Sequence, residues 1–188
     1  ARDELDPAVI KGIRGKSQNP RIASGLGIIP RVVANGRSIY KGKLSRGEAS
    51  GRISKYWEPY HEALTQLLDR ARRVFGRSIL LDMHSMPHEA ALQAGSRRKT
   101  PQIVIGDRFG SSADRVIVDK IEAQFIAQGF HVARNAPFAG AFMTQNYGRP
   151  YLGHHVIQIE IDRALYLDED AIVLSKGASD FKERLKII

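Results

Sequence analysis

The feature that most constrains the fold of this chain is the segment 78–87, in which an apolar run at residues 79–83 is followed by polar side chains. Only Asp82 interrupts the run, and His84 follows two positions later. A short segment that is apolar on both faces is typical of a strand buried in the middle of a sheet covered by helices. In such sheets the ligand site lies just beyond the carboxyl ends of the strands, so His84 is the best-placed chemical group of the sequence.

Three further segments have the composition and length of strands, at residues 102–106, 130–135 and 155–162. The segment 113–128 separates two of them and has helical periodicity, with Ser112 as the expected cap and Gly129 as the terminator. Because strands and helices alternate through most of the chain, the sequence predicts an α/β fold. We expect a mixed, mostly parallel sheet flanked by helices.

The clearest helix is predicted over residues 45–75. Ser45 and Glu48 have the spacing of a capping box, and apolar residues recur at intervals of three and four as a single stripe. Pro59 lies inside this pattern and removes a backbone hydrogen bond, so we expect a kink or a break there. The preceding residues, 1 to about 43, are interrupted by Gly and Pro, and they contain one possible short strand at 28–34 and an Asn35-Gly36 turn.

Composition excludes several classes of protein. The hydrophobic content of 43% in 188 residues excludes global disorder, and no apolar run approaches the length of a membrane span. The absence of cysteine excludes disulfides and thiolate metal sites and fits a reducing compartment, so we expect a cytoplasmic protein. The net charge of +9 comes from dispersed Lys and Arg, a pattern that favours recruitment of small anions over nucleic-acid binding.

Polar side chains follow each of the four predicted strands. Because strand ends at one edge of a sheet converge on one cleft, we expect all of these groups to meet. The groups are Asp82 and His84, Asp107 and Arg108, Arg134 and Asn135, and Glu160 and Asp162.

These residue types point to metal-assisted hydrolysis of a small acidic molecule. His84 is a candidate metal ligand, and Asp82 is a further ligand or the carboxylate that orients the imidazole. Glu160 ends an apolar strand, where burial would raise its pKa toward the range of a general base. Arg108 and Arg134 have the guanidinium geometry that binds a carboxylate with two hydrogen bonds.

Simpler explanations exist for each of these residues. His84 has the alternative of a structural histidine, and Glu160 that of an ion pair with Arg163 or Arg134. His84 and His88 are four residues apart, but Pro87 argues against a helix that would bring them to one face.

The chain resembles the N-formylglutamate amidohydrolase family along nearly its whole length. The resemblance rests on Asp-x-His-Ser-Met-Pro at 82–87, Gly-Asp-Arg-Phe-Gly at 106–110, the Asn135 loop with Tyr-Gly-Arg-Pro at 147–150, and Gln-Ile-Glu-Ile-Asp-Arg at 158–163. The Glu-Leu-Asp-Pro element at 4–7, the run from Gly25 to Arg31 and residues 36–40 fit the family too.

The resemblance implies a fold similar to that of zinc carboxypeptidases and the release of formate from N-formyl-L-glutamate, a late step of histidine breakdown. It implies one divalent metal, Zn²⁺, with His84 as a ligand and Glu160 as the catalytic residue. It also implies a small anionic amino-acid substrate bound by Arg108, Arg134, Asn135 and Tyr147. No nucleic-acid or membrane partner is expected, and the oligomeric state is not predicted.

In this family an N-terminal segment that supplies the other metal ligands precedes the Glu-Leu-Asp-Pro element, with which this chain begins. We therefore expect a single domain over residues 1–188 that lacks that segment. Two alternatives to the deformylase activity are kept. One is an amidase or peptidase that acts on another N-acyl amino acid, and the other is a non-catalytic, metal-free domain that binds anions.

Overall fold

A computed structural model of the chain describes residues 5–15, 19–33, 36–94 and 100–188. The chain divides into two compact units, residues 1–65 and 66–188, which are considered separately here. The prediction of one domain over residues 1–188 stays a prediction.

The first unit is poor in regular structure. Its helices are α1 (Pro20–Ala23), α2 (Arg46–Arg52), the π-helical turn η3 (Ile53–Trp57) and the first residues of α3 (Glu58–Phe75). Its small core contains Val9, Ile10, Ile29 and Ala49. The expected strand at 28–34 is reduced to an isolated bridge between Val32 and Ser38, and Asn35 of the expected turn lies outside the described residues.

Helical structure covers residues 46–75, as the sequence predicts. Ser45 Oγ accepts a hydrogen bond from the Glu48 backbone N–H at 3.0 Å, which confirms the N-cap. The α-helical pattern is interrupted by a π-helical turn at Ile53–Trp57, close to the kink or break expected at Pro59, which lies in the first turn of α3. In this wider turn the Glu58 N–H donates to the Ile53 carbonyl.

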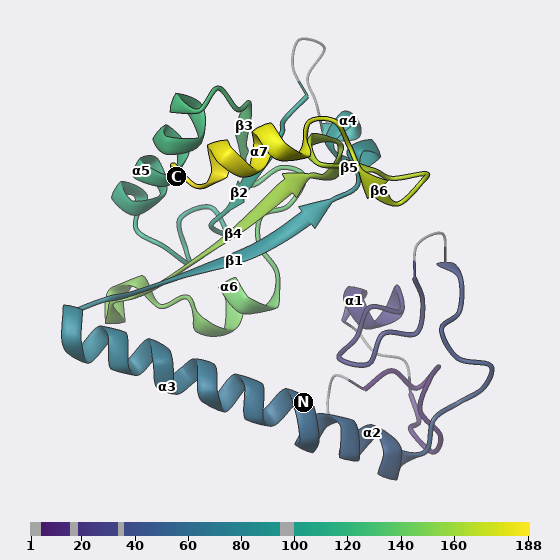
Figure 1. Ribbon diagram of the computed structural model, residues 1–188. Coiled ribbons are helices and arrows are strands. Elements are labelled where there is room, and N and C mark those ends of the chain that lie inside the picture. The colour runs from purple at the N-terminus through teal and green to yellow at the C-terminus, as the bar shows by residue number, and fades with distance from the viewer. Residues whose placement is uncertain (1–4, 16–18, 34–35, 95–99) are drawn as a thin grey trace. The chain divides into compact units, whose positions relative to one another are not determined.

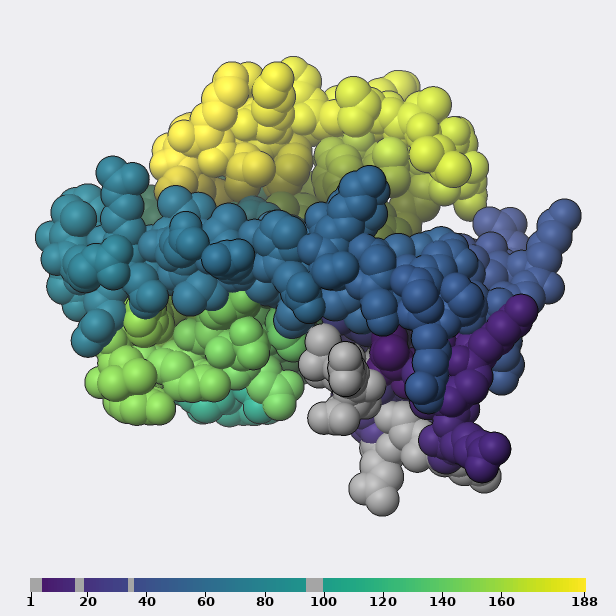
Figure 2. Space-filling model, turned by 90° about the horizontal axis from the view of Figure 1, so that it is seen from below, coloured from purple at the N-terminus to yellow at the C-terminus, as the bar shows by residue number. Residues whose placement is uncertain are grey.

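The predicted apolar stripe of this helix is only partly buried. Within its last ten residues Leu68 is buried, whereas Leu67 and Val74 are exposed. This part of α3 stands at the surface of the second unit in the space-filling view (Figure 2). Periodicity thus located the helix correctly, and of its stripe Leu64 and Ala71 are half-buried whereas Leu67 and Val74 are exposed.

The second unit is built on a four-stranded sheet in the order β1-β4-β2-β3 (Figure 1). Two pairs of strands are parallel, β1 with β4 and β2 with β3, whereas β2 and β4 are antiparallel. The predicted mixed, mostly parallel α/β sheet is confirmed. The strands are β1 (Ser78–Met86), β4 (His154–Asp162), β2 (Ile103–Gly106) and β3 (Val132–Arg134).

Helices and short turns surround this sheet. The helices are α4 (His88–Ala94), α5 (Arg115–Ala127), α6 (Phe142–Tyr147), α7 (Ala178–Leu185) and the 3₁₀ turns η4 (Pro150–Leu152) and η5 (Arg163–Leu165). A small hairpin of β5 (Leu167–Asp168) and β6 (Val173–Leu174) follows η5. Helix α5 begins later than predicted, because Ser112 donates its hydroxyl to the Val156 carbonyl and Asp114 takes the N-cap position.

The main core lies on one face of the sheet. Ile157, Ile159 and Ile161 of β4 pack with apolar residues of β2, α5 and α7, and Figure 1 shows both helices on that face. Because side chains alternate along a strand, the even-numbered residues of β4 point to the opposite face. Four of these, Val156, Gln158, Glu160 and Asp162, are buried, and His154 at the start of the strand is half-buried.

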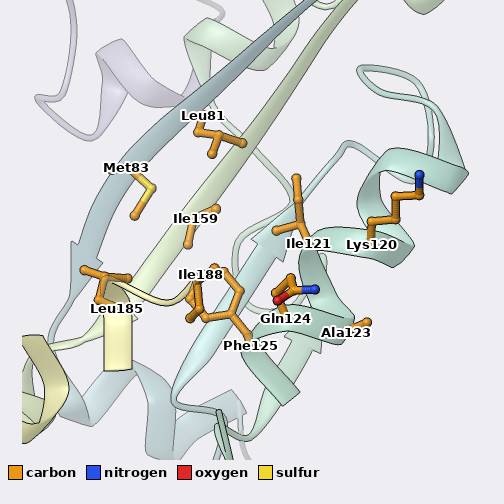
Figure 3. A pocket seen from close by; sticks show the side chains of 10 residues that line it. All are labelled: Leu81, Met83, Lys120, Ile121, Ala123, Gln124, Phe125, Ile159, Leu185 and Ile188. Atoms are coloured by element: carbon orange, nitrogen blue, oxygen red, sulfur yellow. The ribbon is translucent and has the colours of Figure 1, made fainter. Parts of the chain in front are cut away.

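Strand β1 lies at an edge of the sheet and not in its middle, so this part of the prediction is wrong. Ile79, Leu81 and Met83 are each about half exposed on the core-side face. Leu81 and Met83 line an open apolar groove of about 550 Å³ together with Ile159 of β4, Phe125 of α5 and Leu185 of α7 (Figure 3). Among the described residues that line this groove, Lys120 is the one titratable side chain.

Candidate active site

The candidate site lies on the face of the sheet that is opposite to the main core. In the parallel register of β1 and β4, Asp82 is opposite Gln158 and His84 is opposite Glu160. Paired residues on neighbouring strands have their side chains on the same face. The structure therefore places His84, Asp82 and Glu160, three of the predicted site residues, side by side.

His84 and Asp82 form the more open half of this group. The His84 Nε2 atom lies 3.0 Å from Asp82 Oδ1, and the two side chains are 44% and 16% exposed. The other carboxylate oxygen, Asp82 Oδ2, is buried without a hydrogen-bond partner within the described part of the chain. A buried oxygen left in this state costs free energy, so Asp82 is ready to accept a cation or a donor from a ligand.

Glu160 forms the closed half, with only 7% of its surface exposed. Burial raises the pKa of its carboxyl group, because desolvation penalises the charged form, while His84, Gln158 and Arg163 act in the opposite direction. A carboxylate whose pKa is raised toward neutrality is suited to take up and return a proton.

Gln158 is a residue of the site that the sequence reasoning did not select. Its Nε2 donates to Glu160 Oε1 at 2.8 Å, and its own Oε1 accepts from the Ala141 backbone N–H at 2.8 Å. The available signal was its spacing of two residues from Glu160, which places both side chains on one face. Gln158 fixes the carboxylate of Glu160 in one orientation.

A glycine contact brings the loop at Ala139–Ala141 onto this face. A Cβ atom on Gly106 would lie 2.7 Å from the Gly140 nitrogen and 2.8 Å from the Ala139 carbonyl carbon. Both are backbone atoms that cannot move aside, so only glycine allows this approach. The loop thereby reaches Gln158.

The prediction that four polar strand ends meet in one cleft is wrong. Strand β2 runs antiparallel to β4 and pairs Val104 with Glu160. Asp107 is thus three residues, or about 10 Å, from Glu160 along the strand direction, and Asp162 lies in the other direction. Asp107, Arg108 and Asn135 border the site at one end and do not share its centre.

Arg134 lies on the wrong face for the substrate role predicted for it. It pairs with Ile105, which points into the main core. Its guanidinium donates to Asp119 at 2.6 Å and also to Glu122, both on α5. These hydrogen bonds, led by that to Glu122, raise the pKa of Arg134 further. The arginine joins β3 to α5, and we no longer assign it to the substrate.

Arg108 and Asn135 lie together at the end of β2. The Asn135 side chain bonds to the backbone of Asp107 and Phe109, whereas the Arg108 guanidinium has no ion-pair partner within the described residues. Tyr147 is the last residue of α6, a helix that packs on β4, and it is half-buried. The substrate roles of Arg108 and Tyr147 stay predictions.

The alternative ion pairs of Glu160 are not formed. Arg163 donates to Ser85 Oγ at 3.1 Å and lies 3.5 Å from Glu169, and Arg134 is held by α5. His88 does not join His84, because its Nδ1 lies 2.8 Å from the buried Asp162 carboxylate at the start of α4. These contacts leave Glu160 with Gln158 as its hydrogen-bond partner.

Comparison with known proteins identifies the family. Residues 1–167 match the N-formylglutamate amidohydrolase family. The chain belongs to this family. It is 30% identical over 149 residues to the N-formylglutamate deformylase of Pseudomonas aeruginosa and 32% identical over 147 residues to that of Pseudomonas putida. These matches cover 77% and 76% of this chain and 55% and 54% of the two relatives, so the chain spans about half of their length.

Two solved structures resemble this amidohydrolase family member. The N-formylglutamate amidohydrolase of Ralstonia eutropha JMP134 has a TM-score of 0.88 at 33% identity, over 98% of this chain and 68% of that one. A gene product of Agrobacterium tumefaciens has a TM-score of 0.57 at 19% identity over 85% of this chain and 58% of that one, which shows a shared fold alone. The resemblance inferred from the sequence is confirmed.

The described residues do not complete a metal site in this member of the family. His84 and the unpaired oxygen of Asp82 are suitable donors, but no group of three or more His, Asp or Glu residues able to hold a metal occurs within residues 5–15, 19–33, 36–94 and 100–188. A catalytic zinc uses three protein ligands. Zinc therefore stays a prediction. No helix in these ranges is long and apolar enough to cross a membrane.

Proposed function

We propose that this chain carries the catalytic face of a hydrolase that cleaves the formyl C–N amide bond of N-formyl-L-glutamate. The observation that carries the proposal is the pair of His84 and Glu160 on adjacent strands, with Asp82 and Gln158 beside them. Family membership and the names of the two Pseudomonas relatives support the same reaction.

In this proposal Glu160 acts as the general base and then as the general acid. Its carboxylate takes a proton from the water that attacks the formyl carbon. It then gives a proton to the amide nitrogen as the C–N bond breaks, so that formate and L-glutamate are released. The raised pKa of Glu160 suits both steps, and the hydrogen bond from Gln158 keeps one oxygen oriented throughout.

We also propose that Arg108 binds a carboxylate of the substrate. N-formyl-L-glutamate carries two carboxylates, and the net charge of +9 attracts such a dianion. Arg108 is four residues, or about 13 Å along the strand direction, from Val104, the register partner of Glu160, so the arginine side chain and the substrate together would span this separation. Tyr147 is retained as a second candidate contact.

Zinc dependence remains part of the proposal, with His84 and Asp82 as the donors that this chain contributes. A bound divalent cation would polarise the formyl oxygen. The remaining donors would come from residues other than those described. A place late in histidine breakdown is proposed on the family resemblance alone, and a location in the cytoplasm is proposed from the absence of cysteine.

The test is formate release from N-formyl-L-glutamate, followed by NMR. The parent chain should release formate, and Glu160→Gln should lower the rate by about a thousandfold or more. Glu89→Gln is the matched control, because Glu89 is exposed on α4 and should leave the rate unchanged. Equal rates for the parent and Glu160→Gln would contradict the proposal.

Two further measurements separate the alternatives. Faster release from N-acetyl-L-glutamate or another N-acyl amino acid would favour the related amidase. Equilibrium dialysis with zinc needs no activity, and His84→Ala should bind less zinc than the parent if His84 is a ligand. A folded parent that binds L-glutamate, binds no zinc and releases no formate would favour the non-catalytic anion-binding domain.

A further inference from the structure

The turn that carries Arg108 has an unusual backbone. Arg108, Phe109 and Gly110 have φ angles of 52°, 56° and 86°. L-residues seldom adopt positive φ, and two consecutive non-glycine residues in this region persist only where their surroundings impose it. Something other than the local sequence therefore holds this turn.

Three hydrogen bonds of the Asn135 side chain help to hold this turn. Its Oδ1 accepts from the backbone N–H groups of Asp107 at 3.1 Å and Phe109 at 3.3 Å. Its Nδ2 donates to the carboxylate of Asp107 at 2.7 Å, and Asp107 is 5% exposed. Asn135 itself has a φ of 58°, a conformation that asparagine tolerates better than most residues.

The backbone of Arg108 is fixed at the same time. Its N–H donates to the Ala139 carbonyl at 2.7 Å, and its own carbonyl accepts from Ser111 Oγ at 2.8 Å. The backbone N–H groups of all three residues from Asp107 to Phe109 are thus occupied. The side chains are not, since Phe109 is 80% exposed and the Arg108 guanidinium has no hydrogen bond to any described residue.

We propose that Asn135 is a positioning residue that holds the turn so that Arg108 meets the substrate carboxylate. This inference rests on the proposed function, and it replaces the predicted direct contact between Asn135 and the substrate. The carbonyl oxygen and one N–H of the Asn135 side-chain amide form hydrogen bonds with the turn. Its effect on the substrate passes through Arg108.

A set of four variants of the full chain isolates this role. Asn135→Gly keeps the positive φ accessible and removes only the amide. Asn135→Asp keeps an acceptor for the two backbone N–H groups. It also places a second carboxylate next to that of Asp107, and the two negative charges repel each other. Asp107→Asn alone keeps an acceptor oxygen for Asn135 Nδ2 but removes its negative charge. The exchange Asn135→Asp with Asp107→Asn restores a donor and an acceptor in reversed order.

The kinetic measurement determines KM and kcat for N-formyl-L-glutamate separately in each variant and in the parent. Asn135→Gly and Asn135→Asp should raise KM about tenfold or more, with kcat within about threefold of the parent. The exchange should recover most of the lost affinity. Ser111→Ala, which removes one hydrogen bond at the other side of the turn, serves as the matched control and should change KM less. An unchanged KM in Asn135→Gly, or a double variant no better than Asn135→Asp, would overturn the proposal.

A second readout does not depend on activity. Trypsin cleaves after arginine in segments that can unfold locally, so Arg108–Phe109 should be cut faster in Asn135→Gly than in the parent and return toward the parental rate in the exchange variant. Mass spectrometry quantifies the cleavage of the Arg108–Phe109 bond. If the parent releases no formate, the proposed function and the substrate role of the turn both fail. Unaltered cleavage in a folded Asn135→Gly would show separately that Asn135 does not hold the turn.

Discussion

β1 and β4 are neighbouring parallel strands of nine residues each. Both have largely apolar sequences that include polar site residues. In the sheet they have opposite environments. Eight of the nine residues of β4 are buried, whereas β1 lies at an edge and is buried only at its two end residues, with half-buried and exposed positions between them. Glu160 on β4 is consequently desolvated, and His84 on β1 remains accessible. The difference shows that the position of a strand in the sheet, more than its composition, sets the chemistry of the groups it carries.

The largest expected effect is on stability. Leu81 and Ile157 are register partners on the core-side face, and they are 44% and 0% exposed. Ile157→Ala should lower the free energy of unfolding by about 2–5 kcal/mol, because it leaves a cavity in a packed core. Leu81→Ala should lower it by about 1 kcal/mol or less. Urea denaturation of both variants checks this, and equal losses would mean that β1 is buried as deeply as β4.

The next effect concerns the orientation of Glu160. Gln158→Met removes the donor to Glu160 Oε1 with little change in volume and should lower kcat by about tenfold or more. Gln158→Asn, which keeps an amide on a shorter side chain, should lose less than Gln158→Met if orientation is what matters. Gln93→Met on exposed α4 is the control. Formate release at saturating substrate measures the effect, and a parental kcat in Gln158→Met would remove Gln158 from the site.

The buried charge of Glu160 should itself reduce stability at neutral pH. Because burial raises the folded-state pKa of Glu160, its contribution to stability is favourable below its ordinary pKa and is lost as the pH rises through the folded value. Glu160→Gln should therefore exceed the parent in stability by about 1 kcal/mol at pH 7, and the advantage should shrink toward pH 4. Thermal unfolding of the variant and the parent at several pH values tests the sign of this stability difference. A variant less stable than the parent at pH 7 would contradict it.

The smallest expected effect concerns His155, which is 3% exposed on β4. Burial lowers the pKa of His155, and the nearby Asp114 opposes the shift only in part. The unfolded chain therefore binds a proton more readily as the pH falls below about 6.5, and the fold loses stability there. His155→Gln should reduce the loss between pH 7 and 5 by about 0.5 kcal/mol. His131→Gln at an exposed histidine should not, and equal acid sensitivity of the two variants would contradict the prediction.

Much of the fold and of the family was predictable from the sequence. Strand-length apolar runs and helical periodicity indicated the α/β class, and the cap at Ser45 was correct because it depends on a spacing of three residues. Asp82, His84 and Glu160, which the sequence singled out, lie on one face of the sheet, since alternation along a strand is a local property. Membership of the amidohydrolase family followed from the same motifs.

The tertiary structure alone decided which of these residues meet. An apolar run does not reveal whether its strand is central, because an edge strand at an apolar groove has the same composition. The sequence also could not show that β2 runs against β4, a long-range choice that moved Asp107 about 10 Å away from Glu160. The substrate role was assigned to Arg134 without knowledge of its face of the sheet. A shift of one residue along a strand moves a side chain to the other face, and Arg134 lies on the face where Asp119 and Glu122 bind it. Local spacing is set by covalent geometry, whereas strand order, direction and register are set by packing between distant segments.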